Sequence, residues 1–423
     1  MFNRRELIAT AAAALALPVS ARAAETQAQK LGALFDAFFQ ENLRANPESA
    51  TQLGLDTGPN ADLRGKLSDQ SAAGIAAAKA RNLSQLKRLS AIDRSQLTGL
   101  DRVNYDTVLY IRRSNAAIQA FDFGGTAYGP SPYAISQQSG AYQSVPDFLD
   151  TKHPINTAED AEAYVARIEA FAVQLDQNTA RQKHDAGMGV IPPDFILDTA
   201  LTQMTLLRKQ DGIPTAVESL RRRAAAKGLS TINAANATEA WNELVLPALD
   251  RQIAQTQALR KRATHDAGVW HIRQGEAFYA AALKANTTTT LSPDEVHKLG
   301  LDQAAAIGSR LDGLLKAQGL TQGTVGERIA GLYRDPASFF ANTDAGKLEA
   351  IAYCNGRLDA IRPRLSTMFK RLPPYAFEVR RVPPATEAGA ASAFSQAPAL
   401  DGSRPGIVYF NLHDTAEWPR WSL

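Results

Sequence analysis

The chain has 423 residues, of which 45% are hydrophobic and 21% charged, enough for two ordinary domains or one large helical domain around a buried core. The formal net charge is +3, and it falls to +1 if the first 23 residues are removed, since three arginines and one glutamate go with them. This near-neutral balance gives no electrostatic reason to expect nucleic acid or an anionic membrane surface as a partner. After residue 25 no apolar run is long enough to span a membrane, so we expect no membrane span in the mature chain.

Residues 1–23 have the three parts of an export signal. An arginine pair at 4–5 precedes an apolar run over 7–19, and Ala-Arg-Ala at 21–23 has the form of a cleavage site. The pair resembles a twin-arginine signal, although an asparagine replaces the usual Ser or Thr before it, so the twin-arginine and general routes both stay open. We therefore predict a periplasmic or secreted protein. With Cys354 as its sole cysteine, it has no internal disulfide.

Helical patterns dominate residues 24–375, which we predict to be one helical domain. The segment 34–43 places five apolar side chains on one helix face, namely Leu34, Phe35, Phe38, Phe39 and Leu43. Residues 69–93 are rich in strong helix formers. Residues 157–186 and 234–263 carry long amphipathic patterns. Long helices therefore account for most of the predicted fold.

Two helix starts are marked by their capping residues. Asn46 and Pro47 are of the types preferred at the N-cap and at the first helical position. Ser292 and Glu295 have the spacing of a capping box, and the helix that follows is predicted to run to about Gly319, where a glycine suits the C-terminal end. Both signals predict where helices begin.

The character of the chain changes near residue 375. Alternating runs at 377–382 and 406–412 predict two strands, separated by a loop at 385–405. Two strands alone are marginal in water, so this small sheet needs packing partners. The predicted fold is therefore mainly α, with long helices forming a cleft-bearing domain and a small β-sheet near the C-terminus, in a second region over 376–423.

The patterns of familiar catalytic sites are missing from the sequence. There is no G-x-S-x-G elbow, no P-loop and no dinucleotide-binding G-x-G-x-x-G. Ser84 and Lys87 match the S-x-x-K nucleophile motif of penicillin-recognising hydrolases, but its companion motifs are absent, and a solvated helix face is the ordinary alternative. No two histidines lie four residues apart, so the sequence assigns no metal ligand and no catalytic residue. The six histidines are His153, His184, His265, His271, His297 and His413.

Five stretches spread over the chain carry a family resemblance. They are LFDAFFQENLRANPESATQLGLD (34–56), LTGLDRVNYDTVLY (97–110), AISQQSGAYQSVPDFLDTKHPI (134–155), TTTTLSPDEVHKLGL (287–301), and VRRVPP with DGSRPGIVYFNLHDTAEWPRWSL within 379–423. Together they resemble a bacterial family of candidate exported zinc metallopeptidases, named domain of unknown function 885. The resemblance covers essentially the whole mature chain and implies a zincin-like catalytic core, here incomplete.

The resemblance also has implications for activity. In relatives, the segment corresponding to residues 418–423 leads within a few residues into H-E-x-x-x-G-H-H, the helix that carries the zinc ligands. This chain is therefore expected to be the N-terminal portion of such a protein, inactive by itself because metal ligands and general base are missing. Zinc is expected in full-length relatives, and no cofactor in this chain. The alternative is a non-catalytic periplasmic helical protein that binds peptides or has a structural role; the oligomeric state stays open.

By analogy with zinc peptidases, the resemblance suggests where a peptide substrate would bind. The second predicted strand resembles the edge strand that pairs with an extended substrate. On that analogy, Tyr409 and Asn411 contact the substrate. Arg404 and Arg381 would steady the loop or a substrate carboxylate, and plain sheet and loop scaffolding is the alternative for each of the four. Relatives tend to have a tyrosine pair where Phe394-Ser395 stands, and a phenylalanine cannot donate to a developing oxyanion.

Overall fold

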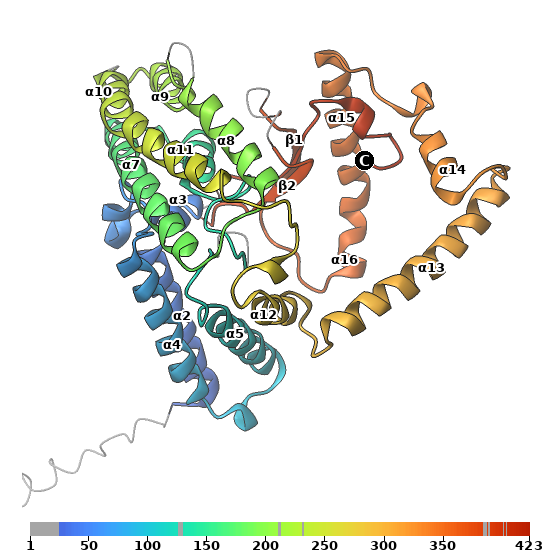
Figure 1. The fold of residues 1–423 in the computed structure, drawn as a ribbon, viewed down its shortest axis with the longest axis horizontal. Coiled ribbons are helices and arrows are strands. Elements are labelled where there is room, and N and C mark those ends of the chain that lie inside the picture. Colours follow the sequence, from blue (N-terminus) through green and yellow to red (C-terminus); the bar gives the residue numbers. More distant parts are fainter. Residues whose placement is uncertain are drawn as a thin grey trace, which may run out of the picture.

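The computed structural model describes most of residues 25–423, while the predicted signal peptide at 1–23 lies outside the described residues. The described residues are 25–125, 130–209, 213–230, 232–383, 387, 390–400, 402 and 404–423. They form a mainly helical structure with a small sheet near the C-terminus, as predicted (Figure 1). Among them, no helix combines the length and the apolar character needed to cross a lipid bilayer.

The first region, here called the helical body, comprises residues 25–287. The long helix α7 lies at its centre, with α6, α10 and α11 packed against it. Tyr164 and Phe171 of α7 and the nearby Trp241 belong to a core with almost no exposed surface. Its helices are α2 (Gln27–Ala45), α3 (Pro47–Gln52), α4 (Ala72–Ser90), α5 (Gly99–Ile118), α6 (Ala141–Thr151), α7 (Ala158–Gly187), α8 (Asp194–Arg208), α9 (Thr215–Ala225), α10 (Ile232–Ala240), α11 (Leu246–Arg260) and α12 (Gly275–Thr287).

The predicted helices of the body are present, with local differences. Of the five apolar side chains on the predicted face of α2, four are buried or half-buried and Phe39 is exposed. Helix α3 begins at Pro47 as predicted, yet the Asn46 side chain donates to a carbonyl of α2 and does not cap α3. The pattern at 234–263 is one long helical run interrupted by a π-helical turn at Trp241–Val245.

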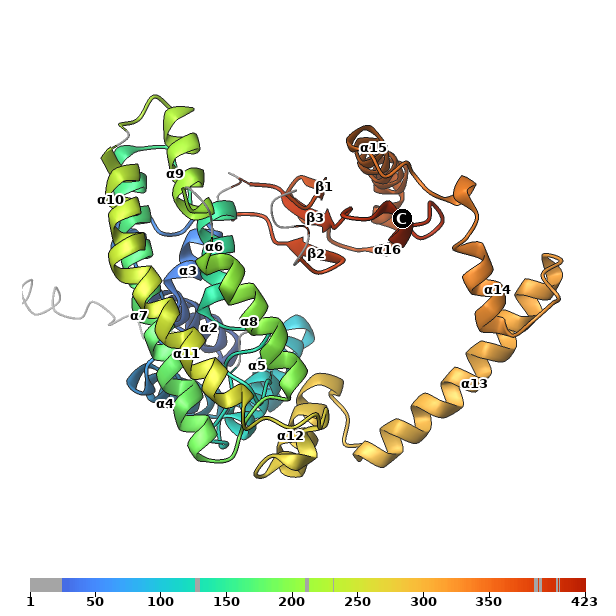
Figure 2. The same cartoon turned by 45° about the horizontal axis from the view of Figure 1, so that its top comes forward.

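The second region, here called the arm, is a helical hairpin that leaves the body after α12. It consists of α13 (Pro293–Ala317) and α14 (Val325–Leu332). Ser292 and Glu295 form the predicted capping box of α13. The helix ends two residues before Gly319, whose positive φ of 78° suits glycine. In Figure 2 the arm arches away from the body, and α13 lies against α14 but stands apart from the body and from α15.

The third region, here called the C-terminal module, comprises residues 344–423. It contains α15 (Asp344–Ile361), α16 (Leu365–Met368), β1 (Phe377–Arg381), β2 (Ala393–Gln396) and β3 (Gly406–Phe410). The strand order is β1-β3-β2, with β1 parallel and β2 antiparallel to β3. The two predicted strands are β1 and β3, whereas β2 lies within the stretch predicted to be a loop.

The position of β3 corrects one expectation from the sequence. Because β1 and β2 pair with its two sides, β3 is the central strand of the sheet and not an edge strand (Figure 2). A central strand has its main-chain groups already paired on both sides. An added peptide strand therefore cannot pair with β3, and the sheet edges belong to β1 and β2.

Candidate functional site

The two edges of the small sheet differ in how their main-chain groups are satisfied. On β1, the amide of Asn355 in α15 closes the outward edge: its Nδ2 donates to Val379 O at 3.0 Å, and its Oδ1 accepts from Val379 N at 2.9 Å. The Arg362 guanidinium also donates to Phe377 O at 3.3 Å. Helix α15 thus covers the β1 edge.

Among the described residues, none covers the outward edge of β2 in this way. Asn411 N donates to Ser392 O at 2.8 Å, which places Ser392 at a hydrogen-bonded position opposite β3. Hydrogen-bonded and outward positions alternate in an antiparallel pair, so the main-chain groups of Ala393 and Ser395 point away from β3. No described residue hydrogen-bonds to the N–H or C=O of either. Both side chains are also exposed, so this edge can accept another strand.

Tyr409 and Phe394 form a cross-strand pair on one face of the sheet. They are opposite each other in the β2–β3 register, and their rings stack with centroids 5.1 Å apart and planes 21° apart. No described residue hydrogen-bonds to the Tyr409 hydroxyl. Phe394 therefore packs against Tyr409 of the neighbouring strand.

Arg381 is held by two carboxylates of its own chain. Its Nε and Nη2 bond the Glu387 carboxylate at 2.6 and 3.0 Å, and its Nη1 lies 2.9 Å from Asp344 Oδ1. These bonds hold the pKa of Arg381 above its ordinary value and, through the same pairing with Arg381, the pKa of Glu387 below its own. Glu387 is 3% exposed. The geometry therefore favours a role in holding the sheet and its loop together.

Asn411 and Arg404 also have internal partners. Asn411 Nδ2 donates to Glu387 O and Ala390 O at 2.7 and 3.0 Å, while its Oδ1 accepts from a main-chain N–H two residues on. Arg404 donates to Ala397 O and, across to the helical body, to Gln52 O, both at 2.8 Å. Of the four residues proposed from the sequence, Arg381 and Asn411 thus meet at Glu387, at one end of β3. Arg404 lies near the other end of this strand, beside Ala397.

The described residues contain no group of three or more His, Cys, Asp or Glu side chains that could hold a metal ion. His153, for example, is fully buried in the body. The Arg167 guanidinium donates to its Nδ1 at 2.7 Å, so the proton lies on Nε2, which donates to Asp160 O at 2.8 Å. Burial, and next the Arg167 charge, lower the pKa of His153 to about 3. This imidazole is a neutral structural group.

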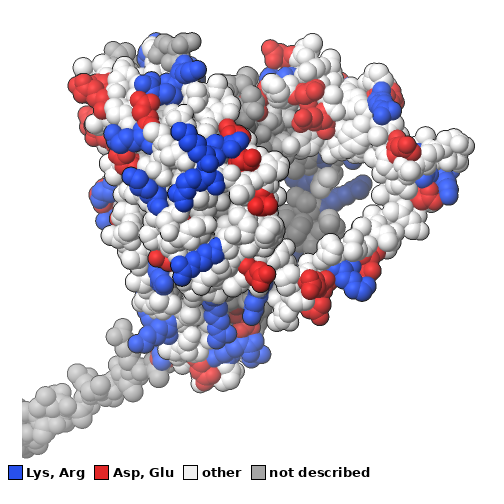
Figure 3. All heavy atoms as spheres, in the orientation of Figure 1, with Lys and Arg blue, Asp and Glu red and all other residues white. Residues whose placement is uncertain are grey.

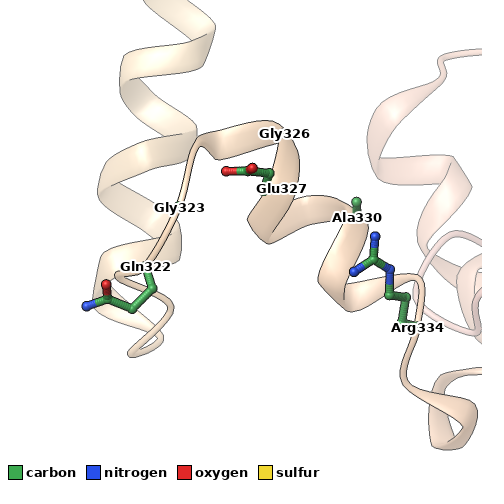
Figure 4. Close-up of a pocket in the computed structure, with 6 residues that line it drawn as sticks. All are labelled: Gln322, Gly323, Gly326, Glu327, Ala330 and Arg334. Carbon is green, nitrogen blue, oxygen red and sulfur yellow. The ribbon is translucent and has the colours of Figure 1, made fainter.

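Two further candidate sites lack the geometry for chemistry. Ser84 and Lys87 are both exposed on α4, and no hydrogen bond joins them, which fits a solvated helix face. An open hollow lies at the turn between α13 and α14 (Figure 4). The Glu327 carboxylate in it already accepts from Thr324 N at 2.7 Å to start α14. The hollow is lined by Gln322, Gly323, Gly326, Glu327, Ala330 and Arg334.

The chain is similar to proteins of known structure and to one family of unknown function. The family "Bacterial protein of unknown function (DUF885)" matches residues 47–423. The chain belongs to this family. A "putative lipoprotein" of Colwellia psychrerythraea is 25% identical with a TM-score of 0.85, and the match covers 93% of this chain and 69% of that one. A "putative lipoprotein of unknown function" from Shewanella oneidensis, 15% identical with a TM-score of 0.57, shares the fold over 94% of this chain and 68% of its own. No curated protein matches the sequence.

The candidate edge of this DUF885 chain was missed by the sequence analysis. Strand β2 has four residues, and it lies in a stretch whose Ala, Ser, Pro and Gly content indicates a loop. The alternation of Ala393 and Ser395 with Phe394 and Gln396 was the available signal. It is too short to outweigh the composition around it. The resemblance pointed to β3, which is paired on both sides, whereas the open edge of the same sheet belongs to β2.

Proposed function

We propose that this chain binds an extended peptide along the outer edge of β2, as the substrate-binding part of an exported metallopeptidase-like protein. The observation that carries the proposal is the uncovered edge at Ala393 and Ser395, next to a β1 edge that α15 covers. An added strand gains main-chain hydrogen bonds that depend little on its sequence. Side chains of the peptide would alternate between the two faces, one of which carries the Phe394–Tyr409 stack.

The proposal assigns binding to this chain and assigns bond cleavage to other polypeptide. The described side chains offer no set of ligands that fits a metal ion, so the proposal gives none of them a catalytic step. In the family resemblance, zinc and its ligands belong to a segment outside these 423 residues. The Colwellia psychrerythraea protein supports this division, because part of it has no counterpart in this chain.

Export is the second part of the proposal. The arrangement of residues 1–23 supports it, and so do the lipoprotein descriptions of the two similar structures. A periplasmic or surface location would give the β2 edge access to peptides outside the cytoplasm. Fusing residues 1–30 to a reporter that is active only after export tests this part by itself.

The edge is tested by a pair of variants at one position. Ser395→Pro removes the outward N–H, whereas Ser395→Ala keeps it, and a proline is tolerated where a strand N–H faces solvent. We expect fluorescent, unstructured peptides of about eight residues, longer than a typical strand, to bind the parent and the Ser395→Ala variant equally. The Ser395→Pro variant should bind about tenfold more weakly, which corresponds to one lost main-chain hydrogen bond.

Equal affinity of the proline variant and the parent would refute binding along β2. Circular dichroism checks that the variant is folded. If it is not, the parent is titrated with the same peptides methylated on alternate main-chain nitrogens, which block strand pairing and leave the protein unchanged. Zinc content and peptide cleavage, measured on the protein purified from the cells that make it, test the metallopeptidase part separately.

A further inference from the structure

Helix α13 carries an apolar stripe that no described part of the molecule covers. Leu299, Ile307 and Leu314 are about half exposed, and their spacings of eight and seven residues place them on one face, about two turns apart. The ion pair of Lys298 with Asp302, at 2.8 Å, lies on another face. In α13, which the structure describes in full, Leu315 is the one buried residue.

Such a helix has little to stabilise it as it stands. Most of the stability of a helix in a protein comes from packing its apolar face, and a capping box supplies only a small part. Single exposed apolar side chains are common, but a stripe along a 25-residue helix is not. The pattern of α13 is that of a helix with a packing partner on the side of the stripe.

The C-terminal module also exposes apolar side chains. Leu348 and Ile361 of α15, and Met368 and Phe369 at the end of α16, are exposed. Figures 1 and 2 both place α13 on one side of a gap and α15 with α16 on the other. The space-filling view shows that side chains do not close this gap, because an opening remains between the arm and the rest of the molecule (Figure 3).

We propose that the arm and the C-terminal module form a seat for further polypeptide, homologous to the part of the Colwellia psychrerythraea protein that this chain does not match. That protein shares the fold of this chain with a TM-score of 0.85, yet this chain covers 69% of it. The unmatched three-tenths of that protein must pack against some surface, and the stripe on α13 is an exposed apolar surface without a described partner. The occupant presents an apolar helical face to α13 and to the end of α16 at once. The inference shares with the proposed function only this outside polypeptide and needs neither metal nor peptide.

The seat is tested by the reactivity of methionine. Met368 is 73% exposed and Met204 is 0% exposed, so in the isolated 423-residue chain hydrogen peroxide should oxidise Met368 quickly and Met204 slowly. In the protein purified from the cells that make it, we expect Met368 to react about tenfold more slowly, because the occupant covers it. Equal reactivity of Met368 in the two preparations would overturn the proposal.

A matched pair of variants on α13 tests whether one occupant contacts both the arm and the C-terminal module. Ile307→Lys changes the stripe, whereas Leu301→Lys changes a side chain of nearly the same exposure, 59% against 57%, about 120° from Ile307 around the helix. Introduced in the cells, Ile307→Lys should restore the oxidation of Met368, and Leu301→Lys should leave it protected. The same response to both variants would contradict a single occupant.

Two other outcomes are distinguishable. If light scattering shows a dimer of the isolated chain in which Met368 is protected and Ile307→Lys removes both dimer and protection, a second copy fills the seat and the proposal is wrong. Protection of Met368 without peptide binding or zinc would leave the seat standing and reject the proposed function. Peptide binding at β2 with a fully reactive Met368 would support the proposed function and reject the seat.

Discussion

The helical body and the C-terminal module bury their apolar residues to very different extents. In the body, side chains from α6 to α11 form one continuous core, in which Tyr164, Phe171 and Trp241 have almost no exposed surface. In the module, Ala350 and Leu412 form a small core with the preceding Phe340, and many other apolar side chains are exposed. The body can therefore satisfy its own apolar surface, whereas the module and arm present surface to something else.

The polar groups follow the same division. The body contains a fully buried set of charged and polar side chains in which Arg167 donates to His153, to Thr51 Oγ1 at 2.7 Å and to Leu63 O at 3.2 Å. In the arm, Lys298 and Asp302 form a pair that lies in solvent and contributes little, whereas Arg328 of α14 is buried and pairs with Asp312 of α13. The comparison therefore predicts that changes in the body affect the whole fold, and changes in the module act locally.

The largest expected effect is the removal of a core tryptophan from the body. Trp241 is 1% exposed and packs near Phe171, with centroids 6.0 Å apart. Trp241→Ala should lower the free energy of unfolding by about 3–5 kcal/mol, because it removes a large side chain from a closed core. In the module, Trp421→Ala should change it by less than about 0.5 kcal/mol, since that indole is 54% exposed. Urea unfolding measures both, and similar losses would mean that the two regions are equally packed.

The second effect is a loss of stability in acid that comes from the body. The unfolded pKa of His153 is about 6.5 and the folded pKa is about 3, lowered by burial and then by Arg167. Between these values the unfolded chain binds more protons, so the stability present above pH 6.5 is lost as the pH falls towards 3. We expect a loss of about 2 kcal/mol between pH 6.5 and 5, at about 1.4 kcal/mol per pH unit.

The control for this pH dependence is His153→Gln. A glutamine can accept from Arg167 and donate to Asp160 O, but it does not titrate. The variant should have a lower stability at pH 7 and a shallower slope between pH 6.5 and 5. A slope equal to that of the parent would assign the acid sensitivity to other groups.

The smallest expected effect is local to the module. Glu387→Gln weakens the two hydrogen bonds between the Glu387 carboxylate and the Arg381 guanidinium, whose side chain is 17% exposed. The variant should lower the stability of the module by about 1–2 kcal/mol. Because the module makes few contacts with the body, the loss should appear as faster hydrogen exchange in β1 and β3, with exchange in α7 unchanged. Faster exchange throughout the molecule would show that body and module unfold as one unit.

Much of the helical structure could be predicted from the sequence, because its helices follow local rules. The capping box at Ser292 and Glu295 and the long amphipathic runs depend on residues three or four apart. The burial of His153 could not be predicted in this way, since it depends on Arg167, fourteen residues away on another element. Its position before a proline indicated only a turn.

The candidate site was harder to predict, because strand order is a property of the whole module. The sequence showed two alternating runs and no sign of which would be central. That was decided by β2, four residues long, and by Asn355 of α15, whose amide covers the β1 edge. Arg381, Asn411 and Arg404 had the right types for recognition, but their internal partners, such as Glu387, lie in a loop with no periodic signal.

The junction between body and module has a consequence for the order of folding. Leu400 N donates to Leu53 O at 3.0 Å and Arg404 to Gln52 O at 2.8 Å, which closes a ring of 352 residues. Bringing the ends of a flexible chain of that length together costs about 5 kcal/mol in entropy, more than two hydrogen bonds return. The helices between must therefore form first and shorten the path. We therefore expect this junction to form late in folding.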